Sequence, residues 1–490
     1  RVDENGLVNY AEVLGGEELN GTNFPSPNTA WTVAAGGATT PVFNNSVLLV
    51  NGNKIYQSIL NAETTYIVTY EVSANVGSSQ LRYYNGSGYV NIDSSIGEHT
   101  LYFTTAASIL NRFYFNVSSG TSVTVLSASV KEVTRDNVPR IDYTGGGCPH
   151  ILAEPMRTNL VPYSEDFSSW TTVSATLTPN QLSPDGTNNA YIVEDDNASG
   201  SGYEKVDVTI TTTATPCTLS VFIKKKTSSV SAYSGIQMGT GFSYLIFDSY
   251  NGTYNQSSNT NYDSIEVENF NSDWWRLKLT ATVTTSTRVA LWGAISSNGT
   301  TISPSATGSE TFWGAQLEVG SYATSYIPTN GEAAGVTRNQ DIFTRDGIGS
   351  LIGSEGVFYA EFKVLHNYQQ QSISISDGTI NTRVLIYATS GGVIRGQIKG
   401  STSVGVNDAS GATATDFNKV AIRYKDNRVD LSVNGATIVT STITNISPTT
   451  LNQLSFTAGV AGSGAFEGQV RNIQVYDSWL TDDQLTSLTT

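Results

Sequence analysis

The sequence predicts an all-β protein made of three β-sandwiches. Gly, with 45 residues, and Tyr, with 25, are abundant while Met occurs only twice, a composition typical of twisted antiparallel sheets with polar turns. Apolar and polar side chains alternate in stretches such as Thr65–Val72, and long runs with helical spacing are almost absent. At 490 residues the chain is too long for one β domain and fits three of ordinary size.

Charge and hydropathy exclude two classes of partner. The net charge of −16 argues against nucleic acid, because its binding needs clustered Lys and Arg side chains that neutralise phosphates. The basic run Lys224–Lys226 follows an apolar strand and is typical of a solvated strand end that discourages edge pairing. No apolar run approaches the roughly 20 residues that span a bilayer, so we expect no membrane insertion. Because the chain begins with Arg, we expect that upstream sequence is missing.

The first part of the chain predicts a jelly roll at residues 17–134, preceded by a connector at residues 1–16. Turn signals at Asn51-Gly52, Asn85-Gly86 and Ser119-Gly120 separate alternating segments at the intervals of a sandwich. The strands expected from these segments are 46–50, 54–60, 66–73, 81–84, 100–104, 112–117 and 122–133.

Residues 135–158 interrupt the alternation and form a predicted collar. Pro139, Gly145–Gly147, Pro149 and Pro155 are residues that do not fit the interior of a central strand or a helix. We therefore interpret the collar as an ordered connector between separately folding modules.

Residues 159–329 repeat the plan of the first module. The segment Thr218–Lys224 parallels Ile67–Ser73, and the ending Glu310–Val319 parallels Thr121–Val133. The chain therefore contains two copies of one unit, and a second jelly roll is expected.

Three sets of residues resemble known families. The stretches RVDENGLV at residues 1–8, PRIDYTGGGCP at 139–149 and EPMRTNLVPYSEDFSSW at 154–170 resemble the collar of tail-fibre and appendage proteins of tailed phages. In those proteins the first stretch leads almost directly into the second, which implies that residues 17–134 are an inserted module. The order NLVPYSEDFSSW, TLSVFIKK, WWRL and WGAQLEVGSYATSYIPT is similar to carbohydrate-binding-module-like jelly rolls of phage fibres and secreted polysaccharide-active enzymes.

The last module, residues 350–490, follows a polar linker at residues 330–349. The order of Glu355–Phe362, Asn418–Tyr424, Phe466–Tyr476 and a short helical stretch at Leu480–Leu485 resembles a concanavalin-type, laminin-G-like sandwich. We expect Thr481 to cap that helix. The predicted fold class is thus all-β, with two jelly-roll β-sandwiches followed by a concanavalin/laminin-G-like β-sandwich.

The sequence offers no convincing catalytic constellation. The E-x-D-x-x-E strand of concanavalin-type glucanases is absent, and Gln397-Ile398-Lys399 lacks the histidine of the Gln-Ile-His strand in the related alginate-lyase fold. A G-x-S-x-G elbow and a phosphate loop are also missing. We therefore predict that the protein is not an enzyme.

Metal and thiol chemistry is also not expected. The three histidines, His99, His150 and His366, lack metal-ligand spacing, so we expect structural roles for them. Cys148 and Cys217 are predicted to be free thiols, with Cys217 a small buried residue.

Calcium is the one ion that the sequence leaves open. The acidic loop Glu194–Asn197 has the oxygen ligands that calcium takes, but a solvated loop is the simpler interpretation. We expect no cofactor and assign no metal ligand, although a structural calcium is possible because the resembled jelly rolls often bind one elsewhere.

A glycan site would need a flat aromatic ring for the apolar face of a sugar, flanked by side chains that reach hydroxyls. Trp170, Trp275, Trp292 and Trp313 are assigned to cores, whereas Trp274, on the opposite face of its strand from Trp275, is expected to be more exposed. The candidate glycan-binding rings are Tyr83, Tyr84, Tyr89, Tyr244, Tyr250, Tyr254, Trp274, Tyr368 and Tyr387.

The expected function is a non-enzymatic fibre or appendage protein of a tailed-phage virion that displays glycan-binding or host-surface-binding modules. The virion setting is what the resemblance implies, and so are the partners: a host cell-surface glycan, other virion proteins and further copies in a homotrimer. Two alternatives stay open. One is the non-catalytic carbohydrate-binding region of a secreted polysaccharide lyase or hydrolase, and the other is a structural capsid decoration or spacer.

Overall fold

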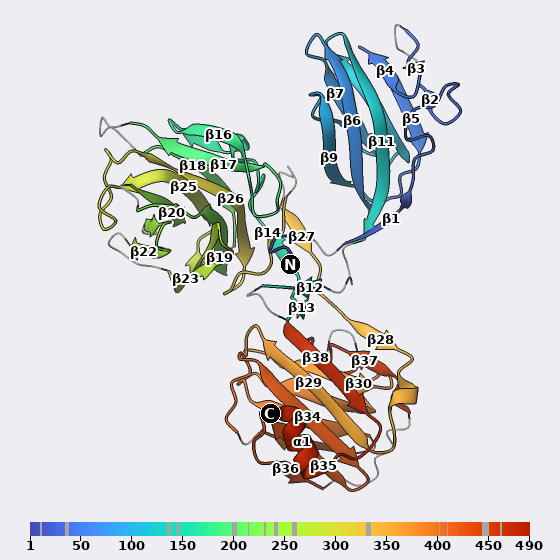
Figure 1. Ribbon diagram of the computed structural model, residues 1–490, viewed down its shortest axis with the longest axis vertical. Helices are drawn as coiled ribbons and strands as arrows, with labels where there is room; N and C mark the ends of the chain where they lie inside the picture. The colour runs from blue at the N-terminus through green and yellow to red at the C-terminus, as the bar shows by residue number, and fades with distance from the viewer. Residues whose placement is uncertain are drawn as a thin grey trace. The chain divides into compact units, whose positions relative to one another are not determined.

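The computed structural model is nearly all β, with a single α-helix among the described residues (Figure 1). It describes residues 1–490 except 10–11, 35–38, 135–137, 139, 145–147, 198–202, 214, 230–231, 240–243, 257–261, 330–334, 401, 409, 443–449 and 461–462. The chain divides into two compact units, Arg1–Ala11 with Pro139–Thr490, and Glu12–Val138. The predicted fold class is confirmed.

The unit Glu12–Val138 is a sandwich of two antiparallel sheets, which we call the first sandwich. One sheet has the order β3-β4-β11-β6-β9 with β1 also on β11, and the other has the order β2-β5-β10-β7-β8. Its strands are β1 (Val13–Glu17), β2 (Thr32–Val33), β3 (Val42–Phe43), β4 (Val47–Val50), β5 (Lys54–Ser58), β6 (Thr65–Val76), β7 (Gln80–Asn85), β8 (Tyr89–Asn91), β9 (Gly97–Thr104), β10 (Arg112–Ser119) and β11 (Ser122–Thr134). The seven strands expected from the sequence are all present.

The alternation of side chains along β6 shows why these residues form a sandwich. Tyr66, Val68 and Tyr70 point into the core and are almost completely buried, while the intervening Thr69 is exposed. Phe113 and Phe115 on β10 reach the same core from the other sheet. Burying such apolar side chains is the main stabilising contribution in a sandwich of this kind.

The second sandwich has the same topology as the first. Its sheets have the orders β16-β17-β26-β19-β24-β23 and β15-β18-β25-β20-β21-β22, so β17, β26 and β19 occupy the places of β4, β11 and β6. Its elements are β15 (Thr171–Val173), β16 (Thr176–Gln181), β17 (Ala190–Asp195), β18 (Lys205–Thr211), β19 (Thr215–Lys224), β20 (Tyr233–Met238), β21 (Leu245–Asp248), β22 (Thr253–Gln256), β23 (Ser264–Asn269), β24 (Trp274–Val283), β25 (Ser286–Ser296), β26 (Gly308–Val319) and the 3-10 helix Phe167–Ser169. The internal repeat inferred from the sequence is therefore a repeat of topology.

Both faces of β24 are covered in the second sandwich. Trp275 packs against the core, and Trp274 points to the other face, where Phe222, Trp313 and Tyr326 surround it. Tyr326 belongs to the segment after β26, which folds back so that the Ile327 N–H donates to Gln316 Oε1 over 2.6 Å. The expectation that Trp274 is exposed is wrong, because this segment covers the sheet and leaves the side chain only 3% exposed.

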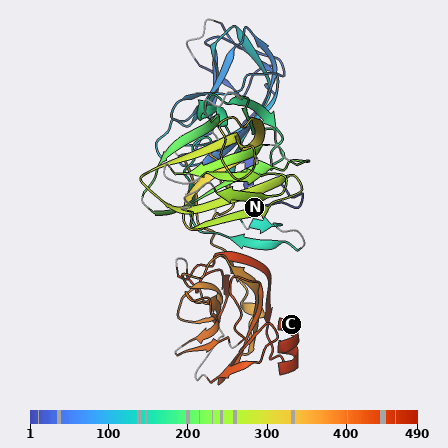
Figure 2. The same ribbon diagram turned by 90° about the vertical axis from the view of Figure 1, so that its left-hand side faces the viewer.

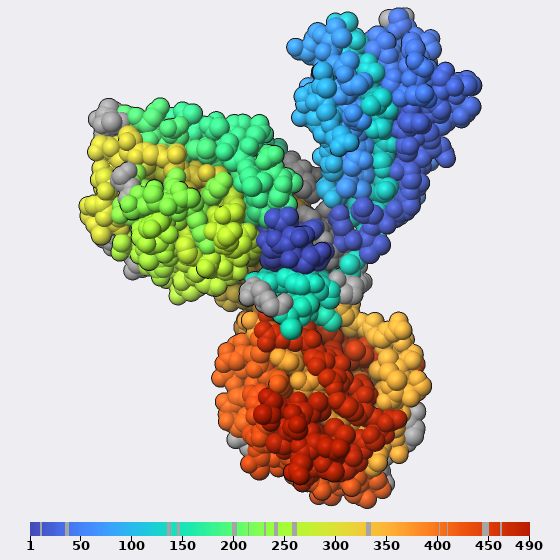
Figure 3. All heavy atoms as spheres, viewed as in Figure 1, coloured from blue at the N-terminus to red at the C-terminus, as the bar shows by residue number. Residues whose placement is uncertain are grey.

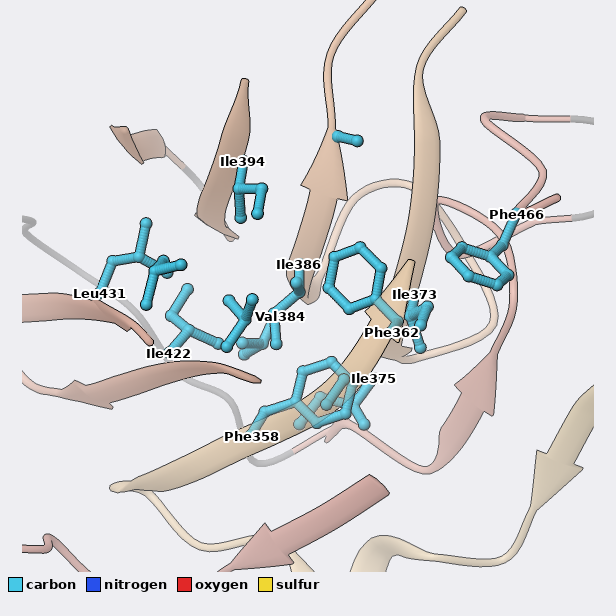
Figure 4. Packing of buried hydrophobic residues seen from close by; sticks show 14 of the residues in the cluster. Phe358, Phe362, Ile373, Ile375, Val384, Ile386, Ile394, Ile422, Leu431 and Phe466 are labelled. Carbon is cyan, nitrogen blue, oxygen red and sulfur yellow. The ribbon is translucent and has the colours of Figure 1, made fainter. Parts of the chain in front are cut away.

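The third sandwich follows the linker and ends in helix α1 (Asp482–Thr489). Its sheets have the orders β28-β37-β30-β31-β32-β33 and β38-β29-β34-β35-β36. The strands are β28 (Thr344–Asp346), β29 (Gly356–Val364), β30 (Gln371–Ser376), β31 (Arg383–Ala388), β32 (Ile394–Lys399), β33 (Ser403–Asn407), β34 (Asn418–Lys425), β35 (Arg428–Val433), β36 (Val439–Ser441), β37 (Gln453–Ser455) and β38 (Gly468–Tyr476), with a 3-10 helix at Gly349–Leu351. Figure 4 shows Phe358, Phe362 and Phe466 packed among branched aliphatic side chains in its core.

Helix α1 packs on the outer face of this sandwich (Figure 2). Leu485 is fully buried there against Val357 and Tyr359. The Thr481 hydroxyl accepts from the Gln484 N–H over 3.2 Å and the Gln484 side chain accepts from the Thr481 N–H over 2.8 Å, so the predicted cap is confirmed as a full capping box.

The collar does not stay a simple connector. Its strands β12 (Arg140–Asp142) and β13 (His150–Ala153) continue the sheet of the third sandwich through β38. A separate pair of strands, β14 (Arg157–Asn159) and β27 (Val336–Arg338), joins the end of the collar to the linker. Before the expected boundary at residue 350, β28 pairs with β37 and Phe343 packs against the core of the third sandwich.

The amino-terminal segment returns to the collar within the same unit. The Val2 N–H donates to Asp142 over 2.6 Å, and the Tyr143 N–H donates to the Val2 carbonyl over 3.0 Å. The segment is the dark-blue patch beside the teal collar in Figure 3. The chain thus leaves and re-enters this unit at neighbouring points, as an inserted first sandwich requires.

A buried cluster of charges fixes the collar to the linker. Glu154 pairs with Arg140 at 2.7 Å and with Arg338 at 2.9 Å, and Arg140 also pairs with Asp341. Burial alone would raise the pKa of Glu154, but the two guanidinium groups hold that pKa well below its usual range. Removing one member of such a cluster leaves an uncompensated buried charge, so the four side chains act as one unit.

We expect Phe343→Ala to destabilise the third sandwich. Phe343 packs edge-on against Phe456 at a ring separation of 5.4 Å, and its truncation leaves a cavity that costs about 2 kcal/mol. In calorimetry of the full chain, one unfolding transition should move down by about 5 °C. Leu351→Ala, at a side chain that is 56% exposed, is the control and should change little. Equal effects of the two variants would contradict the packing of Phe343 in the third sandwich.

Candidate functional site

Four tyrosines form a row across one sheet of the first sandwich. Tyr114 on β10 lies opposite Tyr56 on β5 and opposite Tyr84 on β7, and Tyr84 lies opposite Tyr89 on β8. Directly opposite residues of antiparallel strands share one face of a sheet, so the four rings lie side by side. We call this set the tyrosine row.

The row is on the outer face of the sheet. The residues that alternate with it, among them Ile55, Phe113 and Tyr83, are in the core. Tyr89 at the sheet edge is 38% exposed, Tyr56 and Tyr84 are half-buried, and Tyr114 is covered by its neighbours at 7%. Since the strands are about 4.8 Å apart, the row extends over about 14 Å.

The rings are in contact along the whole row. Centroid separations are 4.9 Å between Tyr56 and Tyr114, 5.5 Å between Tyr114 and Tyr84, and 5.2 Å between Tyr84 and Tyr89. Aromatic pairs at such distances stabilise one another beyond the burial of their area. The row is therefore a continuous aromatic surface that contacts within the sheet hold in place.

Three cations flank the tyrosine row. The Arg82 guanidinium lies 4.5 Å and the Lys54 ammonium 5.3 Å from the centroid of Tyr89, and the Arg112 guanidinium lies 4.5 Å from that of Tyr56. Arg112 also donates to the Tyr114 hydroxyl over 3.2 Å.

Asparagines add amide groups beside the rings. Asn116 lies between Lys54 and Arg82 in the next register line and accepts a hydrogen bond from Arg82 Nε. Asn91 lies opposite Arg82 on β8 and is exposed. Asn116 is only 1% exposed, so of the two amides only that of Asn91 joins the rings and cations as a group that can reach sugar hydroxyls.

The structure separates the candidates that the sequence offered in the first sandwich. Tyr84 and Tyr89 belong to the row, whereas Tyr83 points the other way and is 5% exposed in the core, so it is not available to a sugar. The sequence pattern did not identify Tyr56 and Tyr114 as candidates. Both lie in predicted strands, but only the pairing register places Tyr114 beside Tyr84 and Tyr56 beside Tyr114.

The candidates in the third sandwich do not assemble. Tyr387 is wrong as an accessible ring, because it is 7% exposed and packs with Leu385. Tyr368 is 57% exposed, but one of its faces is stacked on His366 at 3.6 Å.

The candidates in the second sandwich differ in their exposure and contacts. Tyr250 and Tyr254 are 44% and 39% exposed, and Tyr254 lines a pocket of about 130 Å³ together with Tyr233 and Asp248. The remaining candidate, Tyr244, packs edge-on against Trp292 at 5.2 Å.

In the second sandwich, the sheet that corresponds to the sheet of the tyrosine row has a buried aromatic side chain on its outer face. Trp292 lies on β25, the strand that corresponds to β10, and is 2% exposed beneath Tyr244 and Tyr203. The two sandwiches share a topology, and among the described residues the outer face of this sheet carries four tyrosines in one register line in the first.

Two buried carboxyl groups have the raised pKa that a general acid needs, but they do not form a catalytic pair. Burial raises the pKa of Glu165 to about 7, with a further contribution from Asp185, and burial raises the pKa of Glu310 to about 7 as well. Glu310 accepts from the Ser249 hydroxyl, and Glu165 accepts from Asn189. The two carboxyl groups thus have different hydrogen-bond partners, and each makes its own separate contacts.

The histidines make structural contacts. His150 lies 2.9 Å from Asp142 in the collar, and His366 Nε2 lies 2.6 Å from Glu467. Cys217 is fully buried in β19, as expected, and burial raises its thiol pKa to about 11. The other free thiol, Cys148, is exposed.

The residues that the structure describes contain neither a metal-binding cluster nor a membrane-spanning helix. Among them, no three His, Cys, Asp or Glu side chains come together as a metal site requires. In the same residues, no helix has the length and apolar character to cross a membrane.

Comparison with known proteins supports the fold of the third sandwich. Residues 350–486 match the concanavalin A-like lectin/glucanases superfamily. A comparison with curated proteins gives no match.

Several solved structures are similar to parts of this chain. CBM40 of Ruminococcus gnavus IT-sialidase, bound to α2,3-sialyllactose, is 19% identical over 29% of this chain and 85% of its own, with a TM-score of 0.26. The tandem CBM22 domains of Paenibacillus barcinonensis Xyn10C are 9% identical over 64% and 100%, with a TM-score of 0.23. Domains LG4-5 of the mouse laminin α1 chain are 11% identical over 69% and 92%, with a TM-score of 0.23. Scores this low support no conclusion about function.

We expect the second sandwich to become more stable as the pH falls from 8 to 5. Glu310 has a pKa raised to about 7 when folded, so its stabilising contribution is present below pH 4.5 and is lost as the pH rises through 7. The full shift of the Glu310 pKa corresponds to about 3 kcal/mol in the free energy of unfolding. Lys226 offsets little of this effect on Glu310, since its ammonium lies 3.9 Å from the carboxylate and its side chain is 35% exposed.

Denaturant unfolding at several pH values, with Glu310→Gln beside the unchanged chain, tests this expectation. The variant should show a flatter pH dependence. Glu266→Gln, at a carboxylate that is 63% exposed in the same sandwich, should keep the original dependence. An unaltered dependence in Glu310→Gln would refute the assignment.

Proposed function

We propose that the protein is a non-enzymatic glycan-binding protein and that the tyrosine row is a binding face. The observation that carries this proposal is the alignment of four tyrosines in one register line on an outer sheet face. The apolar face of a pyranose packs on such rings, and the polar side chains beside them are placed for its hydroxyls. The length of about 14 Å fits an oligosaccharide rather than a single sugar.

The proposed setting is a fibre or appendage of a tailed-phage virion that binds a host cell-surface glycan and attaches to other virion proteins. The resemblance of the collar supports it, as does the arrangement of three sandwiches without a catalytic constellation among the described residues. The match of residues 350–486 to a superfamily of lectins and glucanases favours, about equally, the non-catalytic region of a secreted polysaccharide lyase or hydrolase. A tail-attachment region upstream would support the first setting, and a catalytic domain there would support the second.

We further propose that the native assembly is a homotrimer. Single glycan sites on an open sheet bind weakly, and several linked copies can raise the avidity by about 10² to 10⁴-fold without a new contact. The collar adds nothing to this argument, because β12 and β13 pair within their own chain.

The binding face is tested with Tyr89→Ala and Tyr56→Ala in the full chain. Each variant removes an accessible ring, and an aromatic contact of about 0.5–1.5 kcal/mol corresponds to binding weaker by about 2- to 10-fold. Affinity electrophoresis against a panel of neutral and acidic polysaccharides gives the measurement. The polysaccharides should be recovered without new reducing ends.

Tyr368→Ala is the matched control, since this exposed tyrosine lies in the third sandwich. Its affinity should equal that of the unchanged chain, and thermal unfolding should show that all three variants are folded. Unchanged binding by both row variants, or an equal loss in the control, would remove the tyrosine row as the site.

Mass measurement in solution tests the trimer. We expect the native protein, with its upstream region, to have three times the mass of one chain at micromolar concentration. A monomer under those conditions would contradict the proposal, whereas dissociation on removal of the upstream region would locate the contacts there.

A further inference from the structure

The cations of the first sandwich gather on the outer face that carries the tyrosine row. Residues 17–134 contain four Lys or Arg residues, and three of them, Lys54, Arg82 and Arg112, flank the row. The fourth, Lys131, is on β11 in the other sheet. The row therefore lies in a local concentration of positive charge on a chain whose net charge is −16.

The carboxylates of the same residues lie elsewhere. Residues 17–134 contain seven Asp or Glu residues, none of them on β2, β5, β7, β8 or β10. Glu71, Glu98 and Glu132 are on β6, β9 and β11 of the other sheet. Asp93 lies after β8, within 3.6 Å of His99 on β9. The sheet of the tyrosine row thus carries cations and no carboxylate on its strands, whereas the other sheet carries the strand carboxylates together with Lys131.

The three cations have no carboxylate partner among the residues that the structure describes. Arg82 donates through Nε to Asn116, and Arg112 donates through Nη1 to the Tyr114 hydroxyl. No ion pair is formed by either of them or by Lys54 in the described part of the chain. No carboxylate of the described residues compensates their positive charge.

The stacking of the guanidinium groups distinguishes between classes of sugar. Arg82 lies over the ring of Tyr89 and Arg112 over the ring of Tyr56, so a neutral pyranose that packs on those ring faces has to displace a cation. An anionic group can instead pair with the outer N–H groups of a guanidinium that stays stacked. A neutral ligand would also leave three like charges close together without compensation.

We propose that the tyrosine row binds an acidic glycan, with Arg82 and Arg112 pairing with its anionic groups and Lys54 adding positive charge. This inference rests on the proposed glycan-binding function and specifies its ligand class. A uronic or sialic carboxylate and a sulfate ester each present two oxygens that a guanidinium can bind through two parallel hydrogen bonds. Electrostatic attraction across an exposed face weakens with salt, so the affinity should fall as ionic strength rises.

The test measures binding of the full chain to four polymers: polygalacturonate, polysialic acid, dextran sulfate and neutral dextran. We expect at least one acidic polymer to bind about tenfold or more tightly than dextran, and its affinity to fall between 50 mM and 300 mM salt. Polygalacturonate and polysialic acid present carboxylates and dextran sulfate presents sulfates, so the preferred polymer identifies the anionic group.

Charge-removing variants locate the binding. Arg82→Gln and Arg112→Gln should each weaken binding of the preferred polymer by about tenfold, the effect of one lost charge-assisted hydrogen bond. Lys131→Gln removes the same charge from the other sheet and should change the affinity less than twofold. Arg82→Lys keeps the positive charge but not the bidentate geometry of the guanidinium, so it should recover part of the affinity lost in Arg82→Gln. Thermal unfolding confirms that each variant is folded.

The outcomes separate this inference from the proposed function. If dextran binds as tightly as the acidic polymers and Tyr89→Ala weakens both, glycan binding stands and the acidic preference is overturned. If none of the three acidic polymers binds, or if Lys131→Gln weakens binding as much as Arg82→Gln does, the inference fails. A single-stranded oligonucleotide that binds as well as the preferred polymer would likewise overturn it, because the face would then recognise polyanions in general.

Discussion

A strand in a sandwich buries one face in the core, and the three sandwiches differ in what covers the second face. In the second sandwich, Tyr326 and the segment around it cover the sheet that contains Trp274. In the third, helix α1 covers part of one sheet and the collar strands extend it. In the first, the tyrosine row remains on an outer face with its edge ring exposed. Binding is therefore proposed where no second layer of apolar packing has closed the face.

The tyrosine row and its cations depend on one another. Neighbouring rings restrict Tyr114, and the guanidinium groups of Arg82 and Arg112 lie against ring faces, where cation–π attraction holds their planes. A side chain ordered before binding loses less conformational entropy on contact with a ligand. The same contacts that order this face thus prepare it for an anionic sugar, and the antiparallel register of four strands maintains the spacing.

The collar shows how an irregular sequence can still satisfy its backbone within one chain. Pro149 and Pro155 flank β13, which is short enough to pair with β38 between them. Beside it, Glu154 joins Arg140 and Arg338 in a buried cluster, an arrangement that stabilises only when every charge has its partner. Local sequence indicated a break in the strand pattern, but the partners of this segment lie up to about three hundred residues away, at Val470.

The sequence by itself determined the all-β class, the repeated jelly roll and the cap at Thr481, because alternation, turn signals and capping are local properties. The concanavalin-like last module was indicated by resemblance to a known family. Only the tertiary structure decided which rings are accessible. Tyr83 and Tyr84 are adjacent in sequence, yet one is in the core and the other in the row. Tyr56 and Tyr114 join that row through pairing register, and Trp274 is buried by a distant segment. Register and second-layer covering arise from contacts between residues far apart in the chain, which a local pattern does not encode.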